Sequence, residues 1–325
     1  MKIIYFPLEH IDSRYTSHLD CDIVDYFESE NLEYIRIYPE ISSPGLKPGM
    51  FLDSNFTTKF KCQQLSCLSD MYQAGLIETD DVLFFSDLWF PGIESIPYMN
   101  HFNQVFPKIR GILHAGSFTD TDEVRNLERW AKNFEDIVFD ITDQVFVGSN
   151  FIKNDVCKKR IINPNKVTVT RFPLDSNLSK FQSLQKESIV IFNGRNHPEK
   201  QPHLFVELKN KLQHKFPQTQ FIWTQEQNLS KDEYYSLLGR SEIVVSFALQ
   251  ENFGFGVLEA VNLGCIPIVP NSVVYPEFIN DEFLYKSFDE CIDLVEKYLT
   301  EGSTNLIIKN NSIFNSQNIF KEWFN

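Results

Sequence analysis

The chain has 325 residues, a formal net charge of −14, and 42% hydrophobic residues. This length leaves room for two domains, and the apolar fraction excludes a disordered protein. The acidic balance argues against a protein that binds nucleic acid mainly through phosphates, because such proteins normally carry a basic field.

Apolar runs in the first half predict strands at 2–7, 34–38, 81–85, 109–113, 144–147 and 167–170. Between them, helical patterns cover 18–30, 60–75, 93–104, 123–134 and 150–160. This alternation predicts parallel strands in a doubly wound α/β sheet.

The second half repeats this alternation after a polar segment at 175–187 that we interpret as an interdomain linker. Strands are expected at 188–192, 220–223, 243–247, 266–269 and 282–286. Helices are expected to begin at His203, Lys231 and Gly256, and a short amphipathic helix at 316–324. The two halves therefore resemble each other in architecture, without a visible sequence repeat.

Cysteine usage and hydropathy predict the compartment. The six cysteines form no CxxC pair and no metal-ligand spacing with histidine, so free thiols in a reducing cytosol are expected. The N-terminus fits a first strand better than a signal peptide, and no segment approaches the roughly 20 apolar residues of a membrane span. We therefore expect a soluble, cytoplasmic protein.

The most informative stretch runs from Gln250 to Pro270, with the sequence QENFGFGVLEAVNLGCIPIVP. Glu251 and Glu259 stand eight residues apart, and an apolar strand lies on either side of this segment. The pattern predicts a βαβ unit whose loop lies at the carboxyl edge of the sheet, where open α/β sheets bind ligands. Two carboxylates and a helix N-terminus at that edge suit a polyhydroxylated ligand that carries phosphate.

A second element precedes it by about sixty residues. The segment 190–202, VIFNGRNHPEKQP, places Arg195 and Lys200 after an expected strand. In this order and strand context, the two elements resemble the Gly-Arg-x4-Lys and E-x7-E signatures of retaining GT-B glycosyltransferases of the group 1, or family 4, type. The resemblance covers roughly residues 141–274, whereas the first 110 residues match only in organisation.

The resemblance implies two Rossmann-like domains that face each other across a cleft. The expected bounds are 1–178 for an acceptor domain, 184–305 for a donor domain, and 306–325 for a helix that packs back on the first domain. The implied reaction moves a sugar from a nucleotide-sugar, with UDP-sugar favoured, to an acceptor hydroxyl with retention of configuration. The implied acceptor is a glycan, a lipid-linked sugar or a small metabolite. The oligomeric state is left open.

The resemblance also assigns roles to residues. Arg195 and Lys200 would bind the donor diphosphate, where fixed cations stabilise the charge that grows on the leaving group. Glu259 would accept hydrogen bonds from the ribose, and Glu251 would contact the donor sugar in the catalytic centre. His114, just after the fourth strand, would face the sugar as a second catalytic residue. The loop that holds the sugar and phosphate would comprise Phe253, Gly254 and Phe255.

The loop after the first strand, 8–15, departs from the family because it lacks a glycine-rich turn. Arg14 could replace backbone donors there, or the loop could contact the acceptor. Asp87 and Trp89, which follow the third strand, are further candidates for the acceptor side, since an aromatic face suits a sugar or base ring. Core packing explains Trp89 equally well.

No metal site is predicted, and no cofactor is expected to be required. Asp120-Thr121-Asp122 could chelate a divalent cation on a diphosphate, so Mg²⁺ is possible although not expected to be essential. Asp120 could equally cap a helix.

Three other functions remain open. Some GT-B enzymes of viral origin glycosylate DNA bases, and a basic cluster at 153–166 would suit nucleic acid, although a solvated helix face explains that cluster better. Sugar-nucleotide epimerases and phosphorylases share the architecture. The altered first loop would also fit a degenerate module that only binds a sugar nucleotide.

Overall fold

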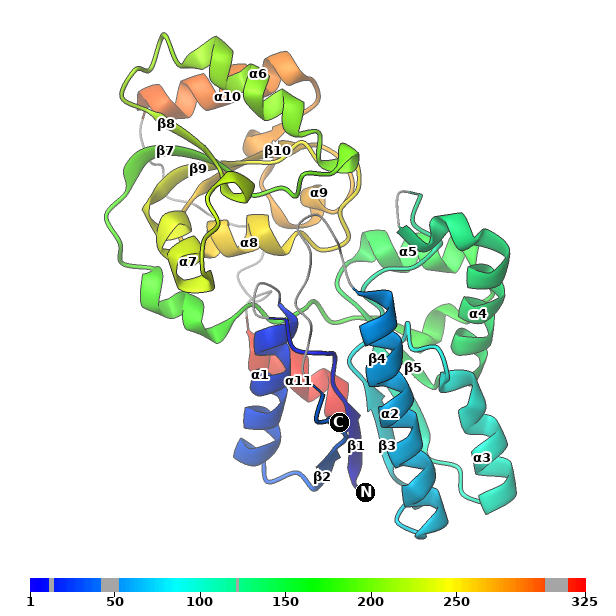
Figure 1. Ribbon diagram of the computed structural model, residues 1–325. Helices are drawn as coiled ribbons and strands as arrows, with labels where there is room; N and C mark the ends of the chain where they lie inside the picture. The colour runs from blue at the N-terminus through cyan, green and yellow to red at the C-terminus, as the bar shows by residue number, and fades with distance from the viewer. Residues whose placement is uncertain (12–14, 42–52, 121–122, 302–314) are drawn as a thin grey trace. The chain divides into compact units, whose positions relative to one another are not determined.

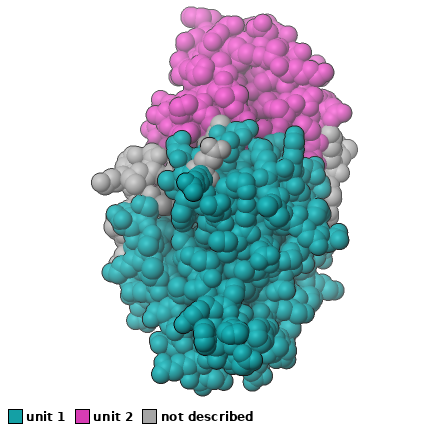
Figure 2. Space-filling model, turned by 90° about the vertical axis from the view of Figure 1, so that its right-hand side faces the viewer, with its two compact units in different colours: residues 1–173, 315–325 teal, residues 174–314 magenta. Residues whose placement is uncertain are grey.

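The computed structural model describes residues 1–11, 15–41, 53–120, 123–301 and 315–325. The chain forms two compact units, Met1–Pro173 together with Asn315–Asn325, and Leu174–Phe314; Figure 2 colours them separately. The polar segment expected as a linker lies inside the second unit. Its residues Ser176–Phe181 form a 3-10 helix, in which Leu178 is buried. The segment appears polar in sequence because most of its other side chains are exposed.

Unit 1 is built on a six-stranded sheet in the order β2-β1-β3-β4-β5-β6, and every neighbouring pair is parallel. The strands are β1 Ile3–Phe6, β2 Tyr34–Arg36, β3 Val82–Phe85, β4 Lys108–Ile112, β5 Gln144–Val147 and β6 Val167–Val169. Three of them, β1, β3 and β5, are almost continuously apolar and buried, as expected of parallel strands covered by helices on both faces.

Helices cover both faces of this sheet (Figure 1). They are α1 Thr16–Ser29, α2 Ser54–Gln73, α3 Ile96–Asn103, α4 Glu128–Ile141, α5 Asn150–Lys159 and α11 Ser316–Phe324. Helix α2 begins six residues before the expected start because the Asp53 side chain caps the backbone N–H groups of Asn55 and Phe56. Helix α4 extends seven residues beyond its expected end, since Val138 and Phe139 continue its buried face.

Aromatic rings from β3 and helix α11 pack together in the core of unit 1. The ring centroid of Phe84 lies 5.9 Å from that of Trp323 and 4.5 Å from that of Phe324. Trp323 is fully buried, and its Nε1 donates to the Thr170 hydroxyl at 2.8 Å. Helix α11 thus supplies core side chains to unit 1, among them Phe320, Trp323 and Phe324.

Unit 2 is built on a five-stranded sheet in the order β11-β10-β9-β7-β8, again entirely parallel. Its strands are β7 Glu187–Phe192, β8 Gln220–Trp223, β9 Ser241–Val245, β10 Ile266–Pro270 and β11 Leu284–Tyr285. Its helices are α6 Pro202–Leu212, α7 Lys231–Arg240, α8 Phe255–Asn262, α9 Tyr275–Phe278 and α10 Phe288–Glu301. Helices α6 and α10 lie on one face and α7 and α8 on the other (Figure 1).

Both units therefore have the doubly wound α/β architecture predicted from the alternation of apolar runs. In each sheet the strands run in one direction, so all the loops after the strands emerge at the same edge. Within the described part of the chain, no helix combines the length and apolarity that crossing a membrane requires.

Candidate functional site

The loop after β7 carries both cations of the Gly-Arg-x4-Lys element. The Arg195 guanidinium donates to Glu199 Oε1 at 2.9 Å, and the Lys200 ammonium lies 3.7 Å from the same oxygen. Trp223 Nε1 donates to the Gly194 carbonyl at 2.8 Å and so fixes the start of the loop. Arg195 keeps 43% of its side chain exposed.

Lys200 connects this loop with the loop after β9. Its ammonium donates to the Gln250 carbonyl at 2.7 Å and to Glu251 Oε2 at 3.1 Å. The other carboxylate oxygen of Glu251 accepts the backbone N–H of Gly254 at 3.2 Å. Only 13% of the Lys200 side chain is exposed. The two motifs therefore meet at one largely buried cation, which contacts a residue fifty positions later in the sequence.

Helix α8 begins at this junction. Gly254 precedes it with φ of 89°, a left-handed conformation that favours glycine. Two residues later, a Cβ on Gly256 would lie 2.8 Å from the Asn193 amide nitrogen, so a side chain there would force Asn193 to move. The aromatic rings of Phe253 and Phe255 pack edge to face with centroids 4.9 Å apart. The glycines thus let the backbone of α8 approach the loop after β7.

Glu259 lies in the second turn of α8 and is buried. The hydroxyl groups of Tyr234 and Tyr235 approach its two oxygens at 3.4 and 3.3 Å. The Tyr235 hydroxyl also lies 3.0 Å from Asp175 Oδ2, and Lys231 pairs with that oxygen at 3.0 Å. Burial raises the pKa of Glu259 to about 7, against the opposing effect of Lys231.

Chemically, this edge of the unit 2 sheet combines two cations, a helix N-terminus and the carboxyl groups of Glu199, Glu251 and Glu259. Cations and backbone N–H groups suit a diphosphate, whereas a buried carboxylate suits hydroxyl groups that donate to it. The structure thus brings together at one edge every residue that the two motifs predict in unit 2.

The candidate residues of unit 1 gather at the carboxyl edge of their own sheet. His114 Nε2 lies 2.8 Å from the Ser86 carbonyl oxygen, and burial lowers the pKa of His114, although Asp87 opposes this effect. The next residue after Ser86, Asp87, accepts the Trp89 backbone N–H at 3.1 Å and lies 3.7 Å from the Lys61 ammonium. A neutral imidazole therefore lies on a loop next to the one that carries Asp87 and Trp89.

Trp89 is fixed at its side chain as well as its backbone. Its Nε1 donates to Glu135 at 3.0 Å, and Lys61 donates to its carbonyl oxygen. Arg14, the remaining predicted residue of this side, lies outside the described residues.

Sequence reasoning missed four side chains that hold this chemistry in place, namely Glu199, Asp175, Tyr235 and Lys61. Glu199 could have been found, because it stands four residues after Arg195 within the motif itself. Tyr235 contacts Asp175 across 60 residues of sequence, so no local pattern could have indicated that contact.

Residues that we considered as alternatives for binding a metal ion or nucleic acid have other partners in the structure. Asp120 pairs with Lys159 at 3.2 Å, and the next two residues of the Asp-Thr-Asp run are not among those described. No group of three or more metal-ligating side chains occurs among the described residues. Within the basic cluster, Arg160 is buried against Glu135 at 2.6 Å, and Lys166 donates to the Asp140 carbonyl at 2.9 Å.

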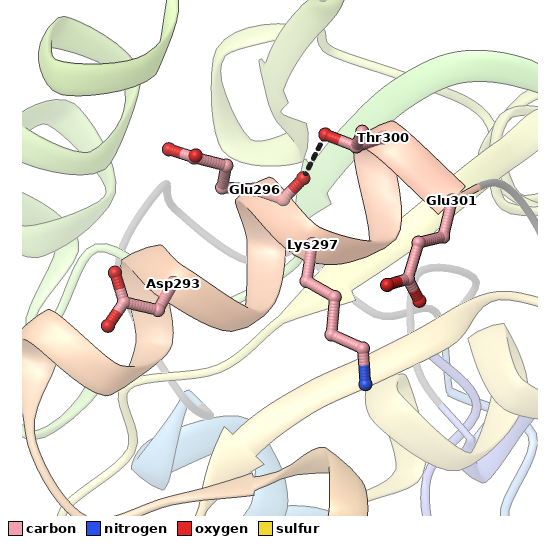
Figure 3. A pocket seen from close by; sticks show the side chains of 5 residues that line it. All are labelled: Asp293, Glu296, Lys297, Thr300 and Glu301. Carbon is pink, nitrogen blue, oxygen red and sulfur yellow. Dashed lines mark hydrogen bonds between the residues drawn. The ribbon is translucent and has the colours of Figure 1, made fainter.

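A hollow elsewhere on unit 2 is not part of this site. Figure 3 shows that all its lining side chains come from helix α10, namely Asp293, Glu296, Lys297, Thr300 and Glu301. Within it, the Thr300 hydroxyl donates to the Glu296 carbonyl at 2.8 Å. A single helix lines this hollow, whereas two loops and the start of α8 meet around Lys200.

We compared the chain with known proteins to identify its fold. No protein-family model matches the chain. The tRNA-queuosine alpha-mannosyltransferase of Drosophila melanogaster is 45% identical to it over 60 residues, which are 18% of this chain and 16% of that protein. The chain thus aligns with only a small part of this curated relative.

Solved structures match over nearly the whole chain. HepE from Anabaena in complex with UDP has a TM-score of 0.57 at 13% identity and covers 100% of this chain and 96% of its own. The lipopolysaccharide outer core galactosyltransferase WaaB, in its apo form, has the same TM-score and coverages at 10% identity. S. aureus MnaA with UDP has a TM-score of 0.51 at 13% identity and covers 98% and 90%. At such identities the likeness shows the fold alone, and it confirms the predicted GT-B fold.

Proposed function

We propose that the chain is a glycosyltransferase that moves a sugar from a nucleotide-sugar donor to an acceptor hydroxyl. One observation carries the proposal: Lys200, on the loop after β7, donates to the Gln250 carbonyl and to the Glu251 carboxylate on the loop after β9. The Lys200 ammonium is therefore held in place before a diphosphate binds. Such preorganised charges stabilise the negative charge that develops on a leaving group.

Each residue then has a chemical role. Lys200 and Arg195 bind the diphosphate and stabilise the negative charge that grows as the bond to the sugar breaks. Glu259 accepts hydrogen bonds from the ribose, while Glu251 and the backbone of 253–255 contact the sugar. His114 contributes a neutral imidazole that can hydrogen-bond a sugar hydroxyl. No carboxylate is assigned as a covalent nucleophile, so we propose retention through attack on the face from which the diphosphate leaves.

UDP-sugar is the proposed donor. Two structures with this fold, HepE and MnaA, hold UDP, whereas nothing in the chain's own residues identifies the base. The experiment incubates the protein with UDP-glucose, UDP-galactose, UDP-GlcNAc and GDP-mannose separately and follows release of the nucleoside diphosphate. Steady turnover that is lost in Lys200→Ala supports the proposal. Binding without turnover would instead indicate a module that only holds a sugar nucleotide.

A second candidate concerns the acceptor. The local match to a tRNA-queuosine alpha-mannosyltransferase, at 45% identity over 60 residues, favours a modified nucleoside in tRNA over other nucleic-acid acceptors. Two of the basic residues at 153–166, Arg160 and Lys166, donate to oxygen atoms of the protein itself. The proposal of a tRNA acceptor therefore does not depend on that basic cluster. The test offers total tRNA and a glycan extract with radiolabelled donor. Label in nuclease-sensitive material supports the tRNA acceptor, and label only in the glycan fraction contradicts it.

A further inference from the structure

A chain of hydroxyl and carboxyl groups leads from Glu259 to the beginning of unit 2. The Tyr235 hydroxyl lies 3.3 Å from Glu259 Oε1 and 3.0 Å from Asp175 Oδ2. Asp175 is held in turn by Lys231 at 3.0 Å and by the backbone N–H of Asn177 at 3.0 Å. Tyr235 and Asp175 are both buried, so these contacts are shielded from solvent.

The Tyr235 hydroxyl has one proton and faces two carboxyl groups. The hydroxyl can donate to only one carboxyl group at a time. Asp175 is the nearer of the two, but Lys231 and the Asn177 N–H also hold it. While Glu259 is neutral, its own O–H can donate to the Tyr235 oxygen and complete the chain. When Glu259 ionises, Lys231 and the Asn177 N–H still hold Asp175, so the Tyr235 hydroxyl can donate to Glu259 Oε1. The remaining lone pairs of the Glu259 carboxylate can then accept from hydroxyl groups of a ligand.

Glu259 has a second partner on its other side. The Tyr234 hydroxyl lies 3.4 Å from Glu259 Oε2, and it also accepts from the Asn193 amide at 3.2 Å. The carboxyl group is therefore fixed between two tyrosines of α7. This arrangement determines the direction in which its free lone pairs point.

We propose that Tyr235, anchored by Asp175, is a positioning residue that orients Glu259 and thereby sets the preference of the donor site for ribose over deoxyribose. The inference rests on the proposed function, since it takes Glu259 as the ribose ligand. Tyr235 acts through Glu259 and does not itself contact the diphosphate. Its removal should therefore affect the nucleoside part of binding and leave the phosphate part unchanged.

The experiment compares ligands that differ only in these parts. Titration calorimetry measures the affinities of UDP, 2′-deoxy-UDP, 3′-deoxy-UDP and pyrophosphate for the wild type and for Tyr235→Phe. We expect the variant to bind UDP roughly tenfold more weakly, about the effect of one hydrogen bond to a charged group. The preference for UDP over at least one deoxy analogue should fall by about the same factor, and pyrophosphate affinity should stay within about twofold.

Two further variants make the result specific. Asp175→Asn removes the anchor and should reproduce the pattern, which keeps the inference testable if Tyr235→Phe folds poorly. Tyr298→Phe makes the same chemical change at a buried tyrosine of α10, on the opposite face of the sheet, and should leave all four affinities unchanged.

An unchanged preference for ribose in both Tyr235→Phe and Asp175→Asn would overturn the inference. Equal weakening of UDP and pyrophosphate would do the same, because it would indicate general damage to the unit. A wild-type protein that binds neither ligand would instead contradict the proposed function, and this inference with it.

Discussion

Protonation of the Glu259 carboxyl group on acidification from about pH 8 to about pH 5.5 should stabilise the fold and at the same time weaken binding of UDP. Burial raises the pKa of Glu259 from 4.5 to about 7. The groups that face it are the hydroxyls of Tyr234 and Tyr235, with Asp175 and Lys231 behind them. Lys231 favours the charged form and Asp175 opposes it, but burial outweighs both.

The sign of the stability effect follows from proton linkage. Between pH 4.5 and about 7, Glu259 holds a proton in the folded protein and has lost it in the unfolded chain. Stability from this group is therefore complete below 4.5 and is lost as the pH rises through 7. Each pH unit changes the free energy of unfolding by about 1.4 kcal/mol. Acidification from about pH 7 to about pH 5.5 should therefore raise the free energy of unfolding by about 2 kcal/mol through Glu259.

The effect on binding has the opposite sign. Ribose hydroxyls donate more strongly to an ionised carboxylate than to a neutral one, so UDP should bind best above pH 7. If only the ionised form binds, affinity falls by about tenfold for each pH unit below the pKa, or roughly 30-fold at pH 5.5. A terminal phosphate titrates near pH 6 as well, and its contribution must be separated.

The variant Glu259→Gln separates the two contributions. Its side chain stays neutral, so any remaining pH dependence of UDP affinity belongs to the phosphate or to other groups. Calorimetric titrations give the affinity and urea denaturation gives the stability, each across the same pH series for both proteins. If wild type and variant show parallel curves in both measurements, Glu259 does not titrate in this range and our account of its environment is wrong.

Three further outcomes are expected. Lys200→Ala should weaken UDP binding by about 10- to 100-fold, since it removes a cation able to hydrogen-bond the diphosphate; Lys211→Ala, which breaks an exposed pair with Glu207, should not change the calorimetric affinity. Gly256→Ala should also weaken UDP binding, because its Cβ would displace Asn193; a variant that keeps wild-type affinity contradicts this. Trp323→Ala should lower the free energy of unfolding by about 3–5 kcal/mol in urea denaturation, and a loss below about 1 kcal/mol would mean that α11 adds little to the core of unit 1.

The strands could be predicted from the sequence with good accuracy. Buried parallel strands require nearly continuous apolar residues, and runs such as 82–85 and 144–147 provide them between polar loops. The clearest error is α10, Phe288–Glu301, which we did not anticipate. Its buried residues Cys291, Val295 and Tyr298 recur at helical spacing, so the signal was present and was overlooked.

The residues proposed to bind the donor could be located because they lie in two short segments. Apolar runs predicted that Arg195, Lys200, Glu251 and Glu259 follow strands of one parallel sheet, whose loops share an edge, and the resemblance implied their roles. What spacing could not show is which groups hold these side chains. Asp175, for example, appeared to belong to a polar linker, and only the packing of 176–181 against α7 brings it near Tyr235.

The residues proposed for the acceptor side were less predictable for a physical reason. Asp87 and Trp89, the two that the structure describes, lie on the loop after β3, and distant charged groups fix them, as Glu135 fixes Trp89 from 46 residues away. Such contacts depend on how helices pack over the sheet, which local sequence patterns do not encode.

The central claim is that the carboxyl edge of the unit 2 sheet binds a nucleoside diphosphate. A thermal-shift panel of UDP, GDP, ADP, CDP and dTDP, with and without Mg²⁺, tests it most directly on the wild type and on Lys200→Ala. A ligand at about a hundred times its Kd stabilises the folded state by roughly 2.7 kcal/mol. The account predicts selective stabilisation by one diphosphate, with UDP favoured, and its loss in the variant. Stabilisation by none of them, or an equal shift in Lys200→Ala, would contradict it.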